Sequence, residues 1–78
     1  MTQMTEETVP LHSTLLATAS YQDEAALLFL EFRDGAIYCY RDVPQEVYEG
    51  LLTAPSKGVY FNRQIRRCFE HFLLRKSC

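Results

Sequence analysis

Apolar and polar positions alternate with a period of two in the middle of the chain. The pattern runs through Leu28–Phe32 (LFLEF) and returns in Ile37–Tyr40 (IYCY). Alternation of this kind, rich in β-branched and aromatic residues, predicts two β-strands. Asp34-Gly35 lies between them, and an Asp-Gly step between alternating runs is a strong signal for a β-hairpin. The sequence therefore predicts an antiparallel hairpin at its centre.

The length of the hairpin loop decides which side chains share a face. A two-residue loop pairs Phe32 with Ile37, whereas a three-residue loop that ends at Gly35 pairs Leu30 with Tyr38. We favour the longer loop, because glycine accepts the positive φ that closes it and the resulting face is uniformly apolar or aromatic. That face, called face A, comprises Leu28, Leu30, Phe32, Tyr38 and Tyr40. The opposite face, called face B, comprises Leu27, Phe29, Glu31, Ile37, Cys39 and Arg41.

One further strand is expected before the hairpin. Weak alternation over His12–Tyr21 predicts a strand whose one side carries Leu15, Ala17, Ala19 and Tyr21. Residues 1–11 show no period, and Pro10 blocks a helix, so this segment is predicted to be a mobile tail. The single domain is then expected to span residues 12–78, since a chain of 78 residues forms one core.

Two helices are expected after the hairpin. Asp42 is a candidate cap for the first, with Gln45 as its capping-box partner, and Pro55 ends it. Ser56 is a candidate cap for the second, which is predicted to run over Val59–Leu74. Its apolar stripe, expected to pack on the sheet, comprises Phe61, Ile65, Cys68, Phe69 and Phe72. The predicted fold class is α+β, a three-stranded antiparallel β-meander followed by two α-helices.

Several short segments follow one another in a specific order. They include Tyr38-Cys39-Tyr40, Val43-Pro44-x-x-Val47-Tyr48 and Ser56-x-Gly58-x-Tyr60-Phe61-Asn62, with Ser13 and Tyr21 upstream and Ile65-Arg66 downstream. In this order the segments resemble the KTSC domain, a short bacterial and phage module that also occurs at the C-terminus of some lysyl-tRNA synthetases. The resemblance extends from Ser13 to Phe72. It implies a common fold, and the synthetase context implies RNA as a partner.

Charge is distributed unevenly along the chain. Residues 1–50 carry a net charge of −7 and residues 51–78 a net charge of +5. The basic residues of the second half are expected on one side of the second helix, where they form either a phosphate-binding surface or an ordinary solvated helix face. The cations proposed to contact RNA are Lys57, Arg63, Arg66 and Arg67. The acidic half restricts any polyanion to a narrow footprint.

Two aromatic residues two positions apart add a second candidate for nucleic-acid contact. Tyr38 and Tyr40 on one strand have the spacing of a platform on which bases stack. The alternative is that both rings belong to the core beneath the helices. The lead hypothesis is a small non-enzymatic module that binds RNA through the basic face of the second helix.

The rival hypothesis is a module for protein interaction or self-association. Face B is also apolar, and helices packed only on face A would leave it exposed, as is typical of an interface. Its candidate interface residues are Leu27, Phe29, Ile37 and Cys39. A symmetric homodimer is the simplest partner for such a face.

Other function classes find little support in the sequence. The three cysteines form no CxxC pair and no histidine lies at ligand spacing, so no metal, cofactor or disulfide framework is expected. Neither histidine lies at a catalytic spacing from a nucleophile or carboxylate, and no small-molecule substrate is evident, so the chain is not expected to be an enzyme. With no long apolar run and no hydrophobic signal segment, we expect a cytoplasmic protein without membrane contact.

Overall fold

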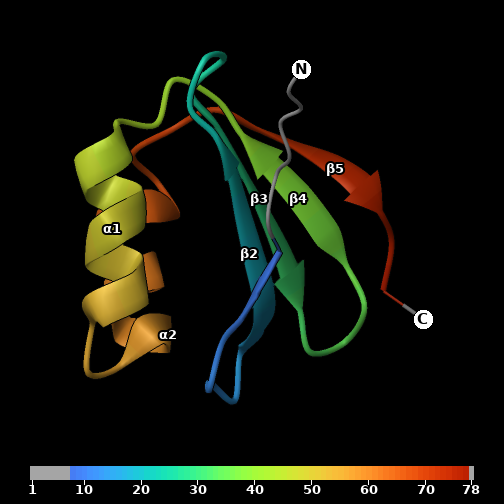
Figure 1. The fold of residues 1–78 in the computed structure, drawn as a ribbon. Helices are drawn as coiled ribbons and strands as arrows, with labels where there is room; N and C mark the ends of the chain where they lie inside the picture. The colour runs from blue at the N-terminus through green and yellow to red at the C-terminus, as the bar shows by residue number, and fades with distance from the viewer. Residues whose placement is uncertain (1–7, 78) are drawn as a thin grey trace.

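The computed structural model describes residues 8–77, and these residues form one antiparallel sheet with helices on one side (Figure 1). The five strands of this region follow in the order β1 to β5 across the sheet. Their bounds are β1 Val9–Pro10, β2 Leu16–Gln22, β3 Leu27–Phe32, β4 Ile37–Tyr40 and β5 His71–Arg75. The helices are α1 Gln45–Thr53 and α2 Lys57–Tyr60, which continues into the π-helical turn η1 Phe61–Ile65. The α+β class is confirmed, but the predicted three strands are five.

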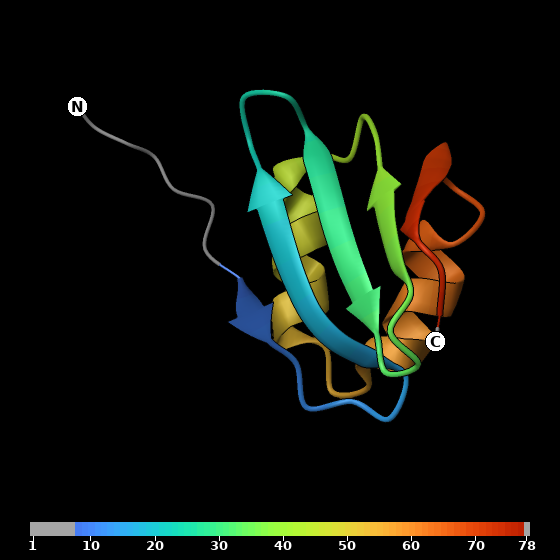
Figure 2. The ribbon, with the colours of Figure 1, turned by 90° about the vertical axis from the view of Figure 1, so that its right-hand side faces the viewer.

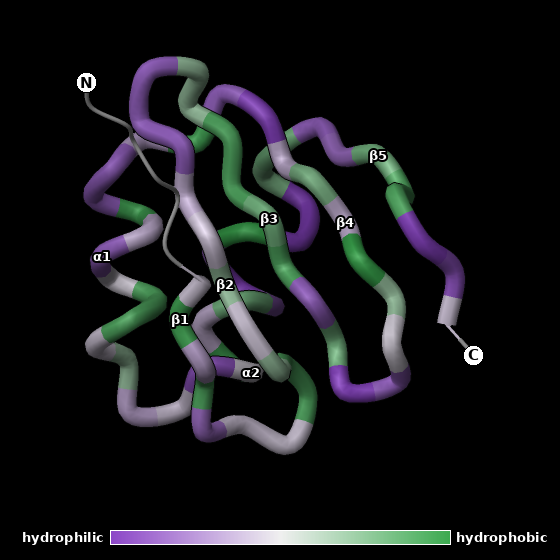
Figure 3. The backbone as a smooth tube through the Cα atoms, turned by 45° about the vertical axis from the view of Figure 1, so that its right-hand side comes forward, coloured by the Kyte–Doolittle hydropathy of each residue, from purple (hydrophilic) through white to green (hydrophobic). Residues whose placement is uncertain are grey.

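The core lies between face A of the sheet and the helices. In the view turned by 90°, the helices lie behind the strands, and face B faces the viewer (Figure 2). Much of β3 and β5 is hydrophobic, as the green colour in Figure 3 shows. The largest side chains that are fully buried are Leu16, Leu28, Leu30, Val43, Leu51 and Ile65. They come from β2, β3, the α1 entry, α1 and η1, so the sheet and the helices share one core.

The central hairpin has the predicted register. Leu30 pairs with Tyr38 and Leu28 with Tyr40, as the three-residue loop requires. Gly35 has a φ of 99°, and its N–H donates to the Phe32 carbonyl over 2.9 Å. A residue with a Cβ is strained at this φ, which is the reason that glycine closes the loop. The assignment of side chains to faces A and B is therefore confirmed for β3 and β4.

The strand before the hairpin begins later than predicted and contains a bulge. It starts at Leu16, not at His12, because the Ser13 hydroxyl accepts hydrogen bonds from the Leu15 and Leu16 N–H groups in a turn. The pairing with β3 shifts between Leu16 and Thr18. A bulge of this kind adds one residue to the strand, so the alternation of side chains between the two faces is out of phase before and after it. Leu16 and Ala19 are consequently both buried, whereas the prediction placed them on opposite sides.

The second helix ends nine residues earlier than predicted. It stops at Ile65, and after a turn the chain forms β5, which pairs with β4 through Cys39–Phe72 and Tyr40–His71. Phe61 and Ile65 are buried as predicted, but Phe72 is 50% exposed and Cys68 is exposed. The helical pattern of the sequence was overridden because β4 offers an edge of backbone donors and acceptors, and pairing with that edge satisfies residues 71–75.

The N-terminal boundary also differs from the prediction. Residues 1–7 of the predicted tail lie outside the described residues. Val9 and Pro10 pair with Ala19 and Thr18 of β2, and the Leu11 side chain belongs to the core. The described fold therefore starts before residue 12.

Of the two predicted helix caps, one is confirmed and one is wrong. Pro44 occupies the N-cap position of α1 without a side-chain hydrogen bond, and Asp42 instead adopts a left-handed conformation with φ of 59°. Gln45 donates to Glu49 one turn ahead and not back to the cap. Ser56 does cap α2, since its side chain accepts the Val59 N–H. No helix among residues 8–77 is long and apolar enough to cross a membrane.

Candidate nucleic-acid interface

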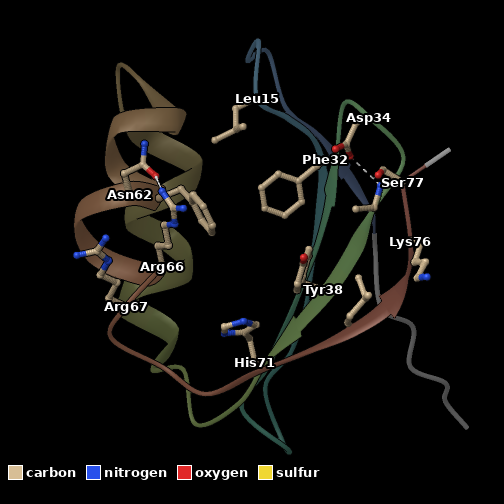
Figure 4. Close-up of a pocket in the computed structure, with 13 residues that line it drawn as sticks. Leu15, Phe32, Asp34, Tyr38, Asn62, Arg66, Arg67, His71, Lys76 and Ser77 are labelled. Carbon is tan, nitrogen blue, oxygen red and sulfur yellow. Dashed lines mark hydrogen bonds between the residues drawn. The ribbon is translucent and has the colours of Figure 1, made fainter.

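An open groove of about 900 Å³ lies on the helix side of the sheet, between η1 and the β4–β5 pair. Arg66 and Arg67 belong to its helical wall, and Lys76, after β5, belongs to the opposite wall. In Figure 4 the Arg67 and Lys76 side chains extend outward from these walls, away from Tyr38. Tyr38 and His71 lie on the floor between these walls. The groove thus has cations on both sides of an aromatic floor.

Local structure explains how each wall is built. The π-helical turn closes with the Arg66 N–H donating to the Phe61 carbonyl, while Phe61 and Ile65 point into the core. Asn62 and Arg66 are four residues apart and lie on the same side of this turn. The Arg66 Nη1 donates to the Asn62 Oδ1 over 3.4 Å (Figure 4). This bond directs the guanidinium along the groove wall.

The floor is a cluster of rings from three segments. The Tyr38 ring meets Phe32 edge-on at 5.6 Å and His71 edge-on at 5.6 Å between centroids. His71 also lies over Tyr40, 5.4 Å away at 37°. The pairing of β5 with β4 creates these contacts, because it places His71 opposite Tyr40. The rings hold one another in place, so the floor is preformed.

The two tyrosines that the sequence singled out occupy different environments. Tyr38 is half-buried and lines the groove, whereas Tyr40 is 3% exposed and belongs to the core. Burial, with a smaller contribution from the Tyr38 hydroxyl, raises the pKa of Tyr40 to about 12, and the Arg66 guanidinium opposes this rise. A base needs an accessible ring face, so the burial of Tyr40 excludes it as a stacking residue.

The predicted cations also separate into two groups. Arg66 and Arg67 line the groove. Lys57 and Arg63 do not: the Lys57 ammonium donates to the Ala54 carbonyl over 2.9 Å at the α1–α2 junction, and Arg63 lies exposed elsewhere on η1. The charge pattern of the sequence indicated a basic region. Which of its cations share a surface depends on the side of the helix from which each one projects.

The groove lining also includes Asn62, His71 and Lys76, which were not among the predicted site residues. The last two follow the point at which the predicted helix gives way to a turn and β5. The basic pair Arg75-Lys76 was the available signal, but with a helix to Leu74 its position could not be assigned. Asp34 is an acidic residue of the groove, opposed by the three cations.

Face B has none of the helices against it (Figure 2). Of the predicted interface residues, Leu27, Phe29 and Ile37 are half-buried, and Cys39 is buried at the centre of the sheet. Burial raises the pKa of the Cys39 thiol, which disfavours the reactive thiolate. Polar residues border this apolar area, since Glu31 accepts from the Thr18 hydroxyl over 3.3 Å and pairs with Arg75 over 3.1 Å.

The chain is thus a small α+β module whose antiparallel sheet is covered by helices on one face. The family model of the KTSC domain matches residues 12–69, and the chain belongs to this family. Within residues 8–77, no group of three or more histidine, cysteine or acidic side chains is arranged to hold a metal ion.

Relatives of known sequence are of two kinds. An uncharacterized protein of Stutzerimonas stutzeri is 44% identical over 55 residues, 70% of this chain and 78% of the relative. A protein of Tsukamurella paurometabola is 37% identical over 61 residues, 78% of this chain and 91% of the relative. A lysine–tRNA ligase of Nostoc punctiforme is 43% identical over 51 residues, 65% of this chain, which is 9% of the ligase.

A solved structure has the same fold. The crystal structure of a KTSC domain protein from Yersinia pestis matches with a TM-score of 0.87 and covers 91% of this chain and all of its own. The two sequences are 24% identical, so the match concerns the fold alone.

Proposed function

We propose that this KTSC domain binds single-stranded RNA in the groove between η1 and β5. The observation that supports the proposal is the placement of Arg66 and Arg67 on one wall and Lys76 on the other, with the Tyr38 ring between them (Figure 4). Phosphates of a single strand would contact the cations, and an unpaired base would stack on the tyrosine. The chain matches part of a lysine–tRNA ligase, whose name states that its substrate is tRNA. This match favours RNA over other polyanions.

The shape of the groove favours a single strand over a duplex. The aromatic floor lies between a helical wall and a strand wall, so only a base that has left its stack reaches the Tyr38 face. In an A-form duplex the base faces are occupied by their neighbours, and a protein contacts the minor groove and backbone instead. We therefore expect the protein to prefer unpaired RNA over a duplex of the same sequence.

The acidic half of the chain is compatible with this proposal. Glu46 and Glu49 project from α1, which contributes no residue to the groove. Asp34 is the acidic side chain in the groove lining, against three cations. The footprint is consequently small, and affinity should be modest and strongly dependent on salt.

Fluorescence anisotropy with a labelled single-stranded RNA tests the proposal. With three phosphate contacts, log K should fall with log salt at a slope of about −2, since each contact on a single strand contributes about −0.7. The double variant R66A/R67A should lower the affinity and flatten the slope. Arg63→Ala is the matched control, because Arg63 lies on the same helical turn outside the groove.

The variant Tyr38→Leu separates stacking from charge. It should weaken binding at all salt concentrations by roughly tenfold, within the range of about 1–3 kcal/mol per stacked base, and leave the slope unchanged. Absence of binding at low salt, or equal losses in R63A and R66A/R67A, would exclude the groove as an RNA site.

A second proposed function is protein contact through face B. The observation that favours it is the apolar area of Leu27, Phe29 and Ile37, which no helix covers. Replacing Phe29 by Lys should abolish such a contact without affecting RNA binding, because Phe29 lies on the opposite side of the sheet from the groove. An effect of Phe29→Lys on RNA affinity at unchanged stability would contradict this separation.

A further inference from the structure

The edge strand β5 is unusually apolar. Three of the four large hydrophobic side chains that are exposed among the described residues are consecutive on it: Phe72 at 50%, Leu73 at 47% and Leu74 at 56%. On its inner side β5 pairs with β4, and no strand within residues 8–77 pairs with its outer side (Figure 1). Exposed apolar edge strands are templates for pairing with another chain.

The direction of the backbone groups along β5 follows from one hydrogen bond. The Arg41 N–H donates to the Glu70 carbonyl over 3.0 Å, so the backbone groups of Glu70 point toward β4. In an antiparallel ladder these directions alternate from residue to residue. Phe72 therefore points its N–H and C=O toward β4, while His71 and Leu73 point theirs to the outer edge.

We propose that two copies of this chain associate through β5, antiparallel, with the two-fold axis at Phe72. In this register His71 of each copy is opposite Leu73 of the other, and both residues have outward backbone groups to exchange. The two Phe72 residues then form the closely spaced pair between these hydrogen-bonded pairs. The same segment is used by both copies, as a closed two-fold dimer requires.

The apolar surface of face B becomes continuous in this arrangement. Phe29, Cys39 and Phe72 are directly opposite one another on β3, β4 and β5, in a row across the sheet. The row ends at Phe72, half exposed, at the edge of a single copy. Across the two-fold axis it continues through the Phe72 ring of the second copy, so the exposed ring is covered.

The charges beside Phe72 identify a second copy as the partner. The pairing of β4 with β5 shifts between Ile37 and Tyr38, which makes Leu74 an extra residue and brings Arg75 to face B. Along face B, Glu70 just before the strand is thus followed by Phe72 and Arg75 on the strand. Antiparallel pairing places Glu70 of one copy beside Arg75 of the other, twice by symmetry. A strand edge that carries an acidic, an aromatic and a basic residue in this order is complementary to an antiparallel copy of itself.

Both charged side chains are accessible for this contact. Glu70 pairs with Arg41 over 3.3 Å and remains 72% exposed, and Arg75 pairs with Glu31 over 3.1 Å and remains 55% exposed. Each carboxylate accepts more than one partner, so the new pairs do not require the old ones to break. Association through β5 does not require RNA in the groove.

Sedimentation velocity of the whole chain tests the proposal, from micromolar to millimolar protein. Reductant is included because the chain has three cysteines. We expect a monomer–dimer equilibrium. Glu70→Arg and Arg75→Glu should each weaken the dimer by about tenfold, since each replaces two opposite-charge pairs by like-charge pairs. The double variant E70R/R75E should return the dissociation constant to within about threefold of the starting protein.

The rescue by the double variant distinguishes association from folding. Within one copy, the double variant places a cation at position 70 beside Arg41 and an anion at position 75 beside Glu31, so neither internal ion pair is regained. Arg63→Glu, exposed on η1, is the matched control and should leave the dimer unchanged. A strictly monomeric protein at millimolar concentration overturns the proposal, as does a dimer that is unchanged by either single charge reversal.

A second variant keeps the test valid if a charge reversal unfolds the protein. Leu73→Pro removes an N–H that points away from β4, so the β4–β5 ladder keeps its hydrogen bonds. Circular dichroism should show an intact fold, and sedimentation should show a monomer. A folded L73P protein that still forms the dimer with unchanged affinity contradicts the assigned edge.

Discussion

The contact between α1 and α2 depends on a glycine in the middle of a helix. A Cβ placed on Gly50 would lie 2.8 Å from Cζ and 3.0 Å from Cε2 of the Tyr60 ring, and closer still to its hydroxyl. The ring is held in place, because its hydroxyl donates to the Val47 carbonyl over 3.0 Å and the ring packs against the core. Gly50→Ala therefore forces the ring to move.

The net effect of Gly50→Ala is the difference between opposing contributions. Alanine stabilises the interior of α1 by about 1 kcal/mol relative to glycine. Displacing the ring costs about 1–3 kcal/mol for overpacking. Loss of the Tyr60–Val47 hydrogen bond adds about 1 kcal/mol. We expect the free energy of unfolding to fall by about 2 kcal/mol, a large part of the ~3–5 kcal/mol that so small a core supplies.

Urea unfolding followed by circular dichroism measures this change. The matched background is Tyr60→Leu, because leucine lacks the three atoms that crowd the new Cβ. In that background Gly50→Ala should stabilise the protein by about 1 kcal/mol, so the sign of the effect reverses. An increase in stability on Gly50→Ala in the unmodified protein, or the same loss in both backgrounds, would refute the steric explanation.

Two further changes probe the core. Leu30→Ala, at a fully buried position, should lower the free energy of unfolding by about 3 kcal/mol in urea titrations, whereas Leu74→Ala on the exposed edge should change it by less than about 0.5 kcal/mol. Tyr40 should make stability depend on alkaline pH: its pKa is about 12 when folded against 10.0 as the reference value, so its contribution is complete below pH 10 and is lost as pH rises toward 12. In urea titrations at pH 9 and 11, Tyr40→Phe should reduce this loss; an unchanged loss contradicts the assignment to Tyr40.

The hairpin and the start of the second helix were predictable because their signals are local. The alternation in β3 and β4, together with a glycine that accepts a φ of 99°, fixes the register of the pair. Ser56 identified the start of α2 because capping is a contact between residues three apart. Face A followed from the same register, and so did the assignment of Tyr38 and Tyr40 to the helix side.

Residues 66–75 show where local signals fail. Their apolar spacing continues the stripe of the second helix through Phe69 and Phe72, and nothing nearby in the sequence contradicts a helix. The chain nevertheless turns after Ile65, because β4 lies some thirty residues earlier and its edge is available for pairing. This turn decides which residues line the groove, because it brings His71 and Lys76 opposite Arg66 and Arg67.

The sequence by itself determined the α+β class, the central hairpin, the family and the presence of a basic C-terminal region. Each of these depends on residues that are neighbours along the chain or on their order. Only the tertiary structure decided the number of strands, the side of the sheet on which the cations lie, and the burial of Tyr40 beside an accessible Tyr38. These features depend on backbone pairing between distant segments. The unpaired backbone groups at the edge of β4 outweigh the helical preference of residues 71–75, because pairing satisfies the hydrogen bonds of both segments.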